Sequence, residues 1–273
     1  MVFVFALLGL FVGSFLNVCI DRLPQGQSIA YPPSHCAGCR HKLGFFDLFP
    51  VFSYLRLRGR CHYCGVPIPR RIPIVEGVTG LLFALLFWKY VMQANPDYVA
   101  LTVALIYACF LLVIFVIDLE TMYVLSIVVY PAMVLALALS LFWPGIQTSG
   151  DWGLGAGGWG MGVGGKLASS LLGGVIGVAA MALPWFISRL VYHREGMGKG
   201  DIELGALVGL MTGFPFALVA LFLSVISGGL ISGALLLFKV KKRTDAIPFG
   251  PFLAAAAMVT LLWGQPILEW WAG

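Results

Sequence analysis

Long apolar runs separated by short polar stretches make up most of the chain. Most of these runs approach the roughly 20 residues that an α-helix needs to cross a bilayer, and the ~10-residue alternating segments of a membrane β-barrel are absent. The pattern therefore predicts an all-α polytopic membrane protein with about eight transmembrane helices. These are expected at residues 1–20, 73–92, 98–117, 122–143, 166–190, 203–214, 215–238 and 249–271.

Two of the runs need separate comment. The first lacks the basic start and the small-residue cleavage site of a signal peptide, so it is expected to remain as a transmembrane helix. The run at 203–214 is short and meets the next one at Gly213-Phe214-Pro215. The two are expected to be separate spans, or else one bent or re-entrant unit, which would reduce the number of spans to seven.

A polar stretch, residues 21–72, interrupts the apolar pattern. It contains prolines, many arginines and four of the six cysteines, and it is expected to form a small domain outside the membrane between helices 1 and 2. The chain is thus divided into the first transmembrane helix (1–20), this small domain (21–72) and a helical membrane domain (73–273). A further stretch outside the predicted helices, 145–165, is rich in glycine and is expected to be a flexible linker.

The composition also indicates a membrane protein. Hydrophobic residues make up 60% of the chain and charged residues only 11%, whereas a soluble domain has about 25% charged residues. The chain has too few polar side chains to cover a water-exposed surface. Its basic residues do not alternate with aromatic ones in a soluble domain, so we expect membrane lipid and not nucleic acid as a partner.

The positions of the basic residues predict the orientation in the membrane. Short cytoplasmic loops carry an excess of lysine and arginine. If the N-terminus lies outside, all of the 17 lysines and arginines except Lys89 and Lys166 fall on the cytoplasmic side. We therefore expect the N-terminus outside and the small domain in the cytoplasm.

The four cysteines of the small domain form two C-x-x-C pairs. Cys36 and Cys39 make the first pair, and Cys61 and Cys64 follow after 21 residues. Two such turns complete the tetrahedral ligand set of a structural zinc ion. Disulfides are the alternative, but they are rare in the cytosol. A domain of about 50 residues also needs additional stabilisation, such as a bound metal ion, because its own core is small. We therefore expect all four cysteines to bind zinc.

Two aspartates lie at the ends of predicted spans. Asp118 ends the third span and Asp201 opens the sixth, so both are expected at the cytoplasmic membrane edge, where they can meet. Acidic residues in membrane helices are costly and are functional candidates by default. Two close carboxyl groups share a proton and act as acid and base, which is sufficient to activate water for peptide hydrolysis. We expect a catalytic pair; a structural acid at the interface is the alternative for each residue.

The residues around Asp201 resemble those of a known family. Gly198-Lys199-Gly200-Asp201 is similar to the G-x-G-D motif of intramembrane aspartyl proteases, and the stretch from Gly196 resembles the signature of type IV prepilin peptidases. The double C-x-x-C domain is also similar to that family. Further segments also resemble the family and occur in the same order as in the family. They lie at residues 13–17, 21–24, 57–60 and 248–251.

This resemblance implies an activity. Members of the family are aspartic endopeptidases that remove the basic leader from type IV prepilins or pseudopilins at the cytoplasmic face of the bacterial inner membrane. Many then methylate the new N-terminus with S-adenosylmethionine. No sequence feature marks a site for that methyl donor. Ser14, Asn17 and Asp21 share one face of the first helix toward the cysteine domain, and helix packing is the favoured explanation for them.

The chain also departs from the family beside the two aspartates. Residues 124–126 are Val-Leu-Ser where the family usually has Ile-Pro-Asp, and Glu203 stands where it usually has lysine. These changes are expected to affect local helix geometry and the charge around the pair. Glu120, Glu195 and Glu203 are expected either to attract the basic leader or simply to be solvated.

The alternative function is a non-enzymatic membrane protein, such as a transporter or a zinc-bearing assembly factor. In that case Asp118 and Asp201 would bind ions or pair with Lys199. Transporters often contain internal repeats and broken helices at the midplane. This chain shows no convincing repeat, and its two aspartates lie at the membrane edge, so the peptidase is favoured.

Overall fold

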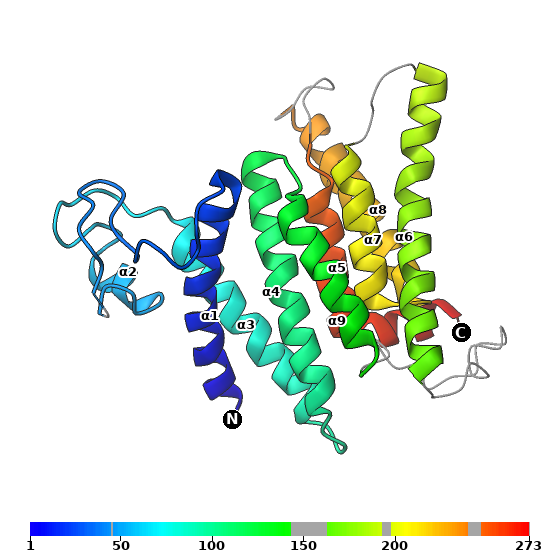
Figure 1. Cartoon of the computed structure of the whole chain (residues 1–273), viewed down its shortest axis with the longest axis horizontal. Helices are drawn as coiled ribbons and strands as arrows, with labels where there is room; N and C mark the ends of the chain where they lie inside the picture. The colour runs from blue at the N-terminus through cyan, green and yellow to red at the C-terminus, as the bar shows by residue number, and fades with distance from the viewer. Residues whose placement is uncertain (45, 143–162, 193–197, 240–246, 273) are drawn as a thin grey trace. The chain divides into compact units, whose positions relative to one another are not determined.

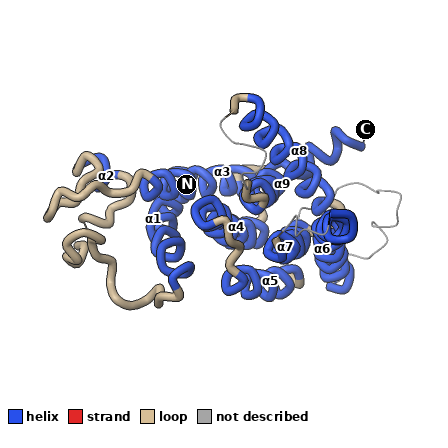
Figure 2. The backbone as a smooth tube through the Cα atoms, turned by 90° about the horizontal axis from the view of Figure 1, so that it is seen from above, coloured by secondary structure: helices blue, strands red, loops and turns tan. Residues whose placement is uncertain are grey.

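The chain folds mainly into α-helices in the computed structural model, which describes residues 1–44, 46–142, 163–192, 198–239 and 247–272 (Figure 1). These residues contain isolated β-bridges but no strand (Figure 2). The predicted linker at 145–165 lies largely outside the described ranges. The all-α prediction is confirmed, with α1 (Val2–Arg22), η1 (Leu23–Gln25), α2 (Phe52–Arg56), α3 (Arg71–Val91), α4 (Tyr98–Thr121), α5 (Ser126–Ser140), α6 (Val163–Tyr192), α7 (Lys199–Thr212), α8 (Phe216–Leu237) and α9 (Gly250–Ala272).

Each predicted apolar run corresponds to a helix, but two of these helices are short. α5 has 15 residues and α7 has 14, which is about 21–22 Å at 1.5 Å per residue and less than the ~30 Å of a bilayer core. Among the described residues, the helices long and apolar enough to cross a membrane are Val2–Gln25, Arg71–Val91, Tyr98–Thr121, Gly164–Ile187, Phe216–Leu237 and Gly250–Trp271. The part of the chain that the structure describes therefore contains six candidate full-length spans, while α5 and α7 are shorter.

The break between α7 and α8 falls at the predicted Gly-Phe-Pro triplet. Gly213 ends α7 with φ of 70°, a conformation that glycine adopts without steric cost. The backbone N–H of Phe214 donates to Ser169 O (3.0 Å), and the Ser169 hydroxyl donates to Phe214 O (2.9 Å). α7 and α8 are thus two separate helices, and the turn between them is bonded to α6.

The chain divides into two compact units, Met1–Leu101 and Thr102–Gly273. In the first unit α1 packs along α3. A Cβ atom at Gly9 would lie 2.7 Å from Thr79 O, and one at Gly13 would lie 2.8 Å from the Cα atom of Glu76. Small residues allow this close approach of two membrane helices, where hydrophobic burial contributes little.

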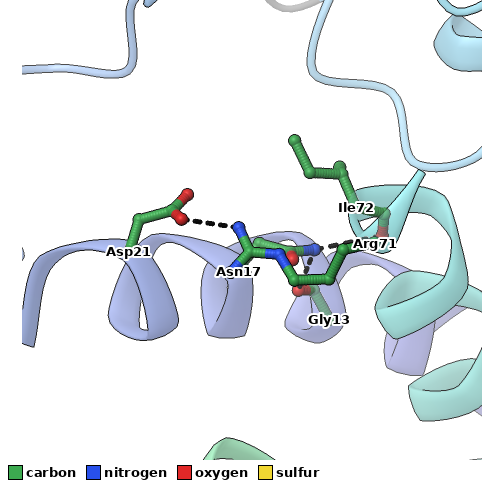
Figure 3. Close-up of polar contacts among 5 residues, drawn as sticks. All are labelled: Gly13, Asn17, Asp21, Arg71 and Ile72. Carbon is green, nitrogen blue, oxygen red and sulfur yellow. Dashed lines mark hydrogen bonds and ion pairs between the residues drawn. The ribbon is translucent and has the colours of Figure 1, made fainter. Parts of the chain in front are cut away.

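Polar groups join the C-terminal part of α1 to the start of α3 (Figure 3). Asn17 Nδ2 donates to Ile72 O at 3.1 Å. The Arg71 guanidinium donates to the Asp21 carboxylate, with 2.5 Å between Nη2 and Oδ1. Asn17 and Asp21 thus bond to α3, which favours the helix-packing interpretation of this face of α1.

In the second unit α7 packs against α5, α6, α8 and α9. It meets α6 through two pairs of glycines, Gly173 with Gly209 and Gly177 with Gly205. A Cβ atom at any of these four positions would clash with the facing helix. Each helix therefore presents a G-x-x-x-G segment to the other. This contact fixes α7, and with it the position of Asp201.

Candidate active site

Asp118 lies in the last turn of α4, inside the second unit. Only 3% of its surface is exposed, and its Oδ2 atom is buried without a hydrogen-bond partner among the described groups. Its surroundings include the apolar side chain of Leu204 from α7. A carboxyl group in such a place is costly for the fold, so a role beyond packing is indicated.

Asp201 lies in the first turn of α7. Gly198 precedes the helix in an extended conformation (φ −71°, ψ 147°) and accepts a hydrogen bond from the Asp201 backbone N–H at 3.2 Å. The Asp201 carboxylate is close enough for its charge to act on Asp118. The structure therefore brings the two predicted aspartates together, although they are far apart in the sequence.

Gly250, the first residue of α9, completes the surroundings of Asp118. Its backbone lies directly against the Asp118 carboxyl group. A Cβ atom at this position would overlap Asp118 Oδ2. Only glycine leaves room for the carboxyl group here, and this gives a physical reason for the glycine in segment 248–251. Sequence analysis marked this segment by resemblance but did not connect it with Asp118.

The connection between α4 and α5 packs onto the start of α7. Its first turn is held by Met122 N–H donating to Asp118 O (2.9 Å) and by the Thr121 hydroxyl donating to Ile117 O (2.8 Å). A Cβ atom at Gly200 would lie 2.7 Å from Val124 Cβ. The glycine next to Asp201 therefore allows the connection to lie directly against α7.

The two departures from the family pattern contact each other. Glu203 accepts hydrogen bonds from the Ser126 hydroxyl (2.8 Å) and from the Tyr130 hydroxyl (2.8 Å), both on α5. Glu203 is half-buried in this contact, so neither a free leader-binding charge nor a simply solvated side chain describes it. Glu120 is exposed, and Glu195 lies outside the described residues. The pattern gave no signal for Tyr130, because an aromatic residue on a membrane helix is common.

The two cysteine pairs form a second candidate site, in the first unit. The ligand atoms of Cys36, Cys39, Cys61 and Cys64 all lie within 4.8 Å of one another. The Sγ atoms of Cys36 and Cys64 are 3.7 Å apart, and thiolates bound at 2.3 Å around a tetrahedral zinc are about 3.8 Å apart. The four sulfur atoms are thus already arranged as ligands for one metal ion such as zinc.

The two cysteine pairs lie in turns with the same backbone hydrogen bond, from the first cysteine to the residue five positions later. Cys36 N–H donates to His41 O (3.0 Å) and Cys61 N–H to Val66 O (2.8 Å). Backbone N–H groups of Cys39 and Gly38 hydrogen-bond the Cys36 thiol and lower its pKa to about 6. This favours the thiolate, which is the form that binds metal. The four sulfurs make a complete ligand set without the nearby histidines.

Both parts of the chain match known protein families. Residues 7–90 match the Bacterial Peptidase A24 N-terminal domain, and residues 105–233 match the Type IV leader peptidase family. No solved structure matches the chain.

Several curated relatives cover nearly the whole chain, and each carries the name prepilin leader peptidase/N-methyltransferase. The relative from Pseudomonas putida is 32% identical over 95% of this chain and 90% of its own length. That from Aeromonas hydrophila is 31% identical over 99% and 92%, and that from Myxococcus xanthus is 33% identical over 99% and 74%. Since the two domain matches occur in order and the relatives align over almost the full length, the chain belongs to the type IV leader peptidase family.

Proposed function

We propose that this multi-pass membrane protein is an aspartic endopeptidase that removes the basic leader from type IV prepilins or pseudopilins and then methylates the new N-terminus. Its family membership and the names of its relatives support both activities. The observation that carries the peptidase proposal is the meeting of Asp118, buried at the end of α4, with Asp201 at the start of α7.

The arrangement of the two carboxyl groups suits general acid–base hydrolysis. In such a pair one carboxyl group carries a proton and the other is ionised. The ionised group takes a proton from a water molecule, whose oxygen then attacks the peptide carbonyl carbon. The protonated group donates its proton to the reacting peptide, and the C–N bond breaks to release the leader and a new amino terminus. Neither a metal ion nor a covalent intermediate is needed in this scheme.

The orientation of the chain would deliver the leader to this pair. The distribution of the basic residues supports an orientation with the N-terminus outside and the α4–α5 connection in the cytoplasm. The bacterial inner membrane is the expected location. A prepilin with a basic leader ahead of an apolar helix would keep the leader in the cytoplasm, so its cleavage site would lie at the membrane edge beside Asp118 and Asp201.

S-adenosylmethionine would be the methyl donor, as the N-methyltransferase name of the relatives implies. We assign no residue of this chain to its binding. The structural zinc ion would be held by Cys36, Cys39, Cys61 and Cys64, and would stabilise the loop between α1 and α3 rather than take part in hydrolysis.

Replacing either aspartate by asparagine tests the peptidase proposal. Asp118→Asn and Asp201→Asn should each abolish leader cleavage in detergent or vesicles, because an amide cannot exchange the required proton. Asp97→Asn is the matched control: Asp97 accepts the Ala100 backbone N–H at 2.8 Å at the start of α4, and asparagine caps a helix equally well. Mass spectrometry of a prepilin substrate measures the product. Cleavage retained in either site variant would remove that residue from the mechanism.

A further inference from the structure

An apolar segment lies within the cysteine-bearing loop of the first unit. Residues 46–57 have the sequence FDLFPVFSYLRL, with Asp47 and Arg56 as the only charged residues, and they include the short helix α2. The metal-binding function does not explain so many large apolar side chains between the two cysteine pairs. We refer to residues 46–57 as the apolar segment.

The apolar segment lies beside the middle of a membrane-spanning helix. The rings of Phe49 and Phe11 meet edge to face, with 5.4 Å between their centroids. Phe11 is eleven residues before Arg22, the last residue of α1, which is about 16 Å along the helix. Figure 1 likewise shows α2 next to the middle of α1 and not beyond its end. For a membrane-spanning α1, this position corresponds to the depth of the lipid chains.

One backbone group of the segment is paired in a way that fits a water-free place. Val51, just before α2, donates its backbone N–H to Glu76 Oε2 at 2.7 Å. Glu76 lies in the second turn of α3, is only 4% exposed, and also bonds to Ser14 of α1. In water this N–H would need no such partner. In lipid each backbone polar group must be paired within the protein.

Apart from Arg56 near its end, the exposed side chains of the segment are apolar. Phe52 is 59% exposed and Leu55 is 67% exposed. They continue the exposed apolar face of α1, where Phe11 is 42% and Phe15 is 52% exposed. Arg56, near the end of the segment, and Arg58 and Arg60 just after it are exposed, and they suit the phosphates of lipid headgroups.

We propose that residues 46–57 insert into the lipid bilayer beside α1, with Phe52 and Leu55 among the acyl chains. The occupant of this surface is lipid, because the surface is continuous with the lipid-facing side of a transmembrane helix. The cysteine loop is then not a free cytoplasmic domain. It is anchored in the membrane through the part of the loop that separates its two metal-binding turns. This inference does not depend on the proposed enzymatic activity.

Photo-crosslinking in lipid vesicles tests the proposal. A photoreactive p-benzoylphenylalanine is placed at Phe52 or Leu55 of the full chain, which is reconstituted in phosphatidylethanolamine and phosphatidylglycerol and irradiated. Mass spectrometry should find lipid adducts at both positions, as at Phe15 on α1, the positive control. Tyr31, in the same loop outside the segment and 77% exposed, should give far fewer lipid adducts.

Two results would overturn the proposal. One is the absence of lipid adducts at Phe52 and Leu55 while Phe15 still forms them. The other is preferential crosslinking of these positions to a co-reconstituted prepilin, which would make the surface a substrate-binding face. Hydrogen exchange on the unmodified chain in lipid nanodiscs checks the same point without substitutions. The amides of 51–57 should exchange at least about tenfold more slowly than those of 26–31, and equal rates would contradict insertion.

Discussion

At the scale of single residues, the surroundings of Asp118 explain how a carboxyl group is held ready at the end of a membrane helix. The Gly250 backbone lies directly against its carboxyl group, while Oδ2 has no hydrogen-bond partner among the described groups. An unsatisfied buried oxygen costs about 1–3 kcal/mol. This cost is consistent with a functional role.

The close approach of Gly250 leads to a specific prediction. Gly250→Ala should lower the rate of leader cleavage by about a hundredfold or more, since an added methyl group forces the carboxyl group of Asp118 aside and a displacement of ~1 Å has that effect. Gly229→Ala in α8 is the control, because a Cβ atom there meets no atom within 4 Å. Initial cleavage rates and thermal unfolding should be measured for both. If Gly250→Ala cleaves like the unmodified chain, the proposed arrangement around Asp118 is wrong.

Glu203 gives a second prediction at this scale. Its carboxylate accepts hydrogen bonds from Ser126 and Tyr130, each worth about 1 kcal/mol, or somewhat more for a charged acceptor. Glu203→Gln keeps an acceptor and should retain most activity, whereas Glu203→Lys loses both contacts and should reduce the rate of cleavage by loosening α5 from α7. Tyr130→Phe should have a smaller effect than Glu203→Lys.

The substrate dependence of the rate separates this role from a binding role. If Glu203 attracts the basic leader, Glu203→Gln should raise KM with little change in kcat. If Glu203 positions α5 against α7, Glu203→Lys should lower kcat while Glu203→Gln leaves both constants nearly unchanged. A rise in KM for Glu203→Gln alone would contradict the positioning role.

The sequence predicted the candidate residues better than their contacts. Asp118 and Asp201 could be singled out because carboxyl groups are rare at membrane edges, and spacing alone grouped the four cysteines. The contacts of Gly250 and Tyr130 could not be predicted, since they depend on how α9 and α5 pack against their neighbours. The sequence marked Ser126 and Glu203 as separate departures. Their hydrogen bond joins residues 77 positions apart and became visible only in the structure.

At the scale of secondary structure, apolar length predicted the helices well but not all of their roles. α5 and α7 are too short to span a bilayer alone, yet α7 packs against four neighbours. The two glycine pairs between α6 and α7 make this possible by allowing the backbones to touch. Such contacts depend on which faces of two helices meet. A helix that is apolar on all sides does not show in its sequence which face contacts its neighbour.

The two cysteine turns lead to a prediction about metal. Purified protein should contain about one zinc ion per chain, and Cys36→Ser should lower this content because one of four ligands is lost. Removing the metal should make residues 26–67 more sensitive to protease than the helices, since metal binding supplies folding free energy to the loop. Cys109→Ser, in α4, is the control and should keep its zinc. Elemental analysis showing no zinc in protein purified without chelator would contradict the zinc assignment.

At the scale of the whole molecule, the candidate site of each unit lies near connections that carry basic residues. In the second unit Asp118 ends α4, Asp201 opens α7 and Gly250 opens α9, so all three lie at the same end of the bundle. In the first unit the cysteine loop joins the end of α1 to the start of α3. Both places carry arginines or lysines in the sequence, whereas the α3–α4 connection carries none. Basic residues are typical of the cytoplasmic side.

Reporter fusions test this orientation directly. Alkaline phosphatase fused after Asn95, between α3 and α4, should be active, because that connection is expected on the outer side, where the enzyme forms its disulfides. Fused after Met122, between α4 and α5, it should be inactive, while green fluorescent protein at the same place should fluoresce. The opposite pattern would place Asp118 and Asp201 on the outer face. A leader peptide retained in the cytoplasm could not reach the pair there, so the proposed route of the substrate would fail even if the pair hydrolyses peptides.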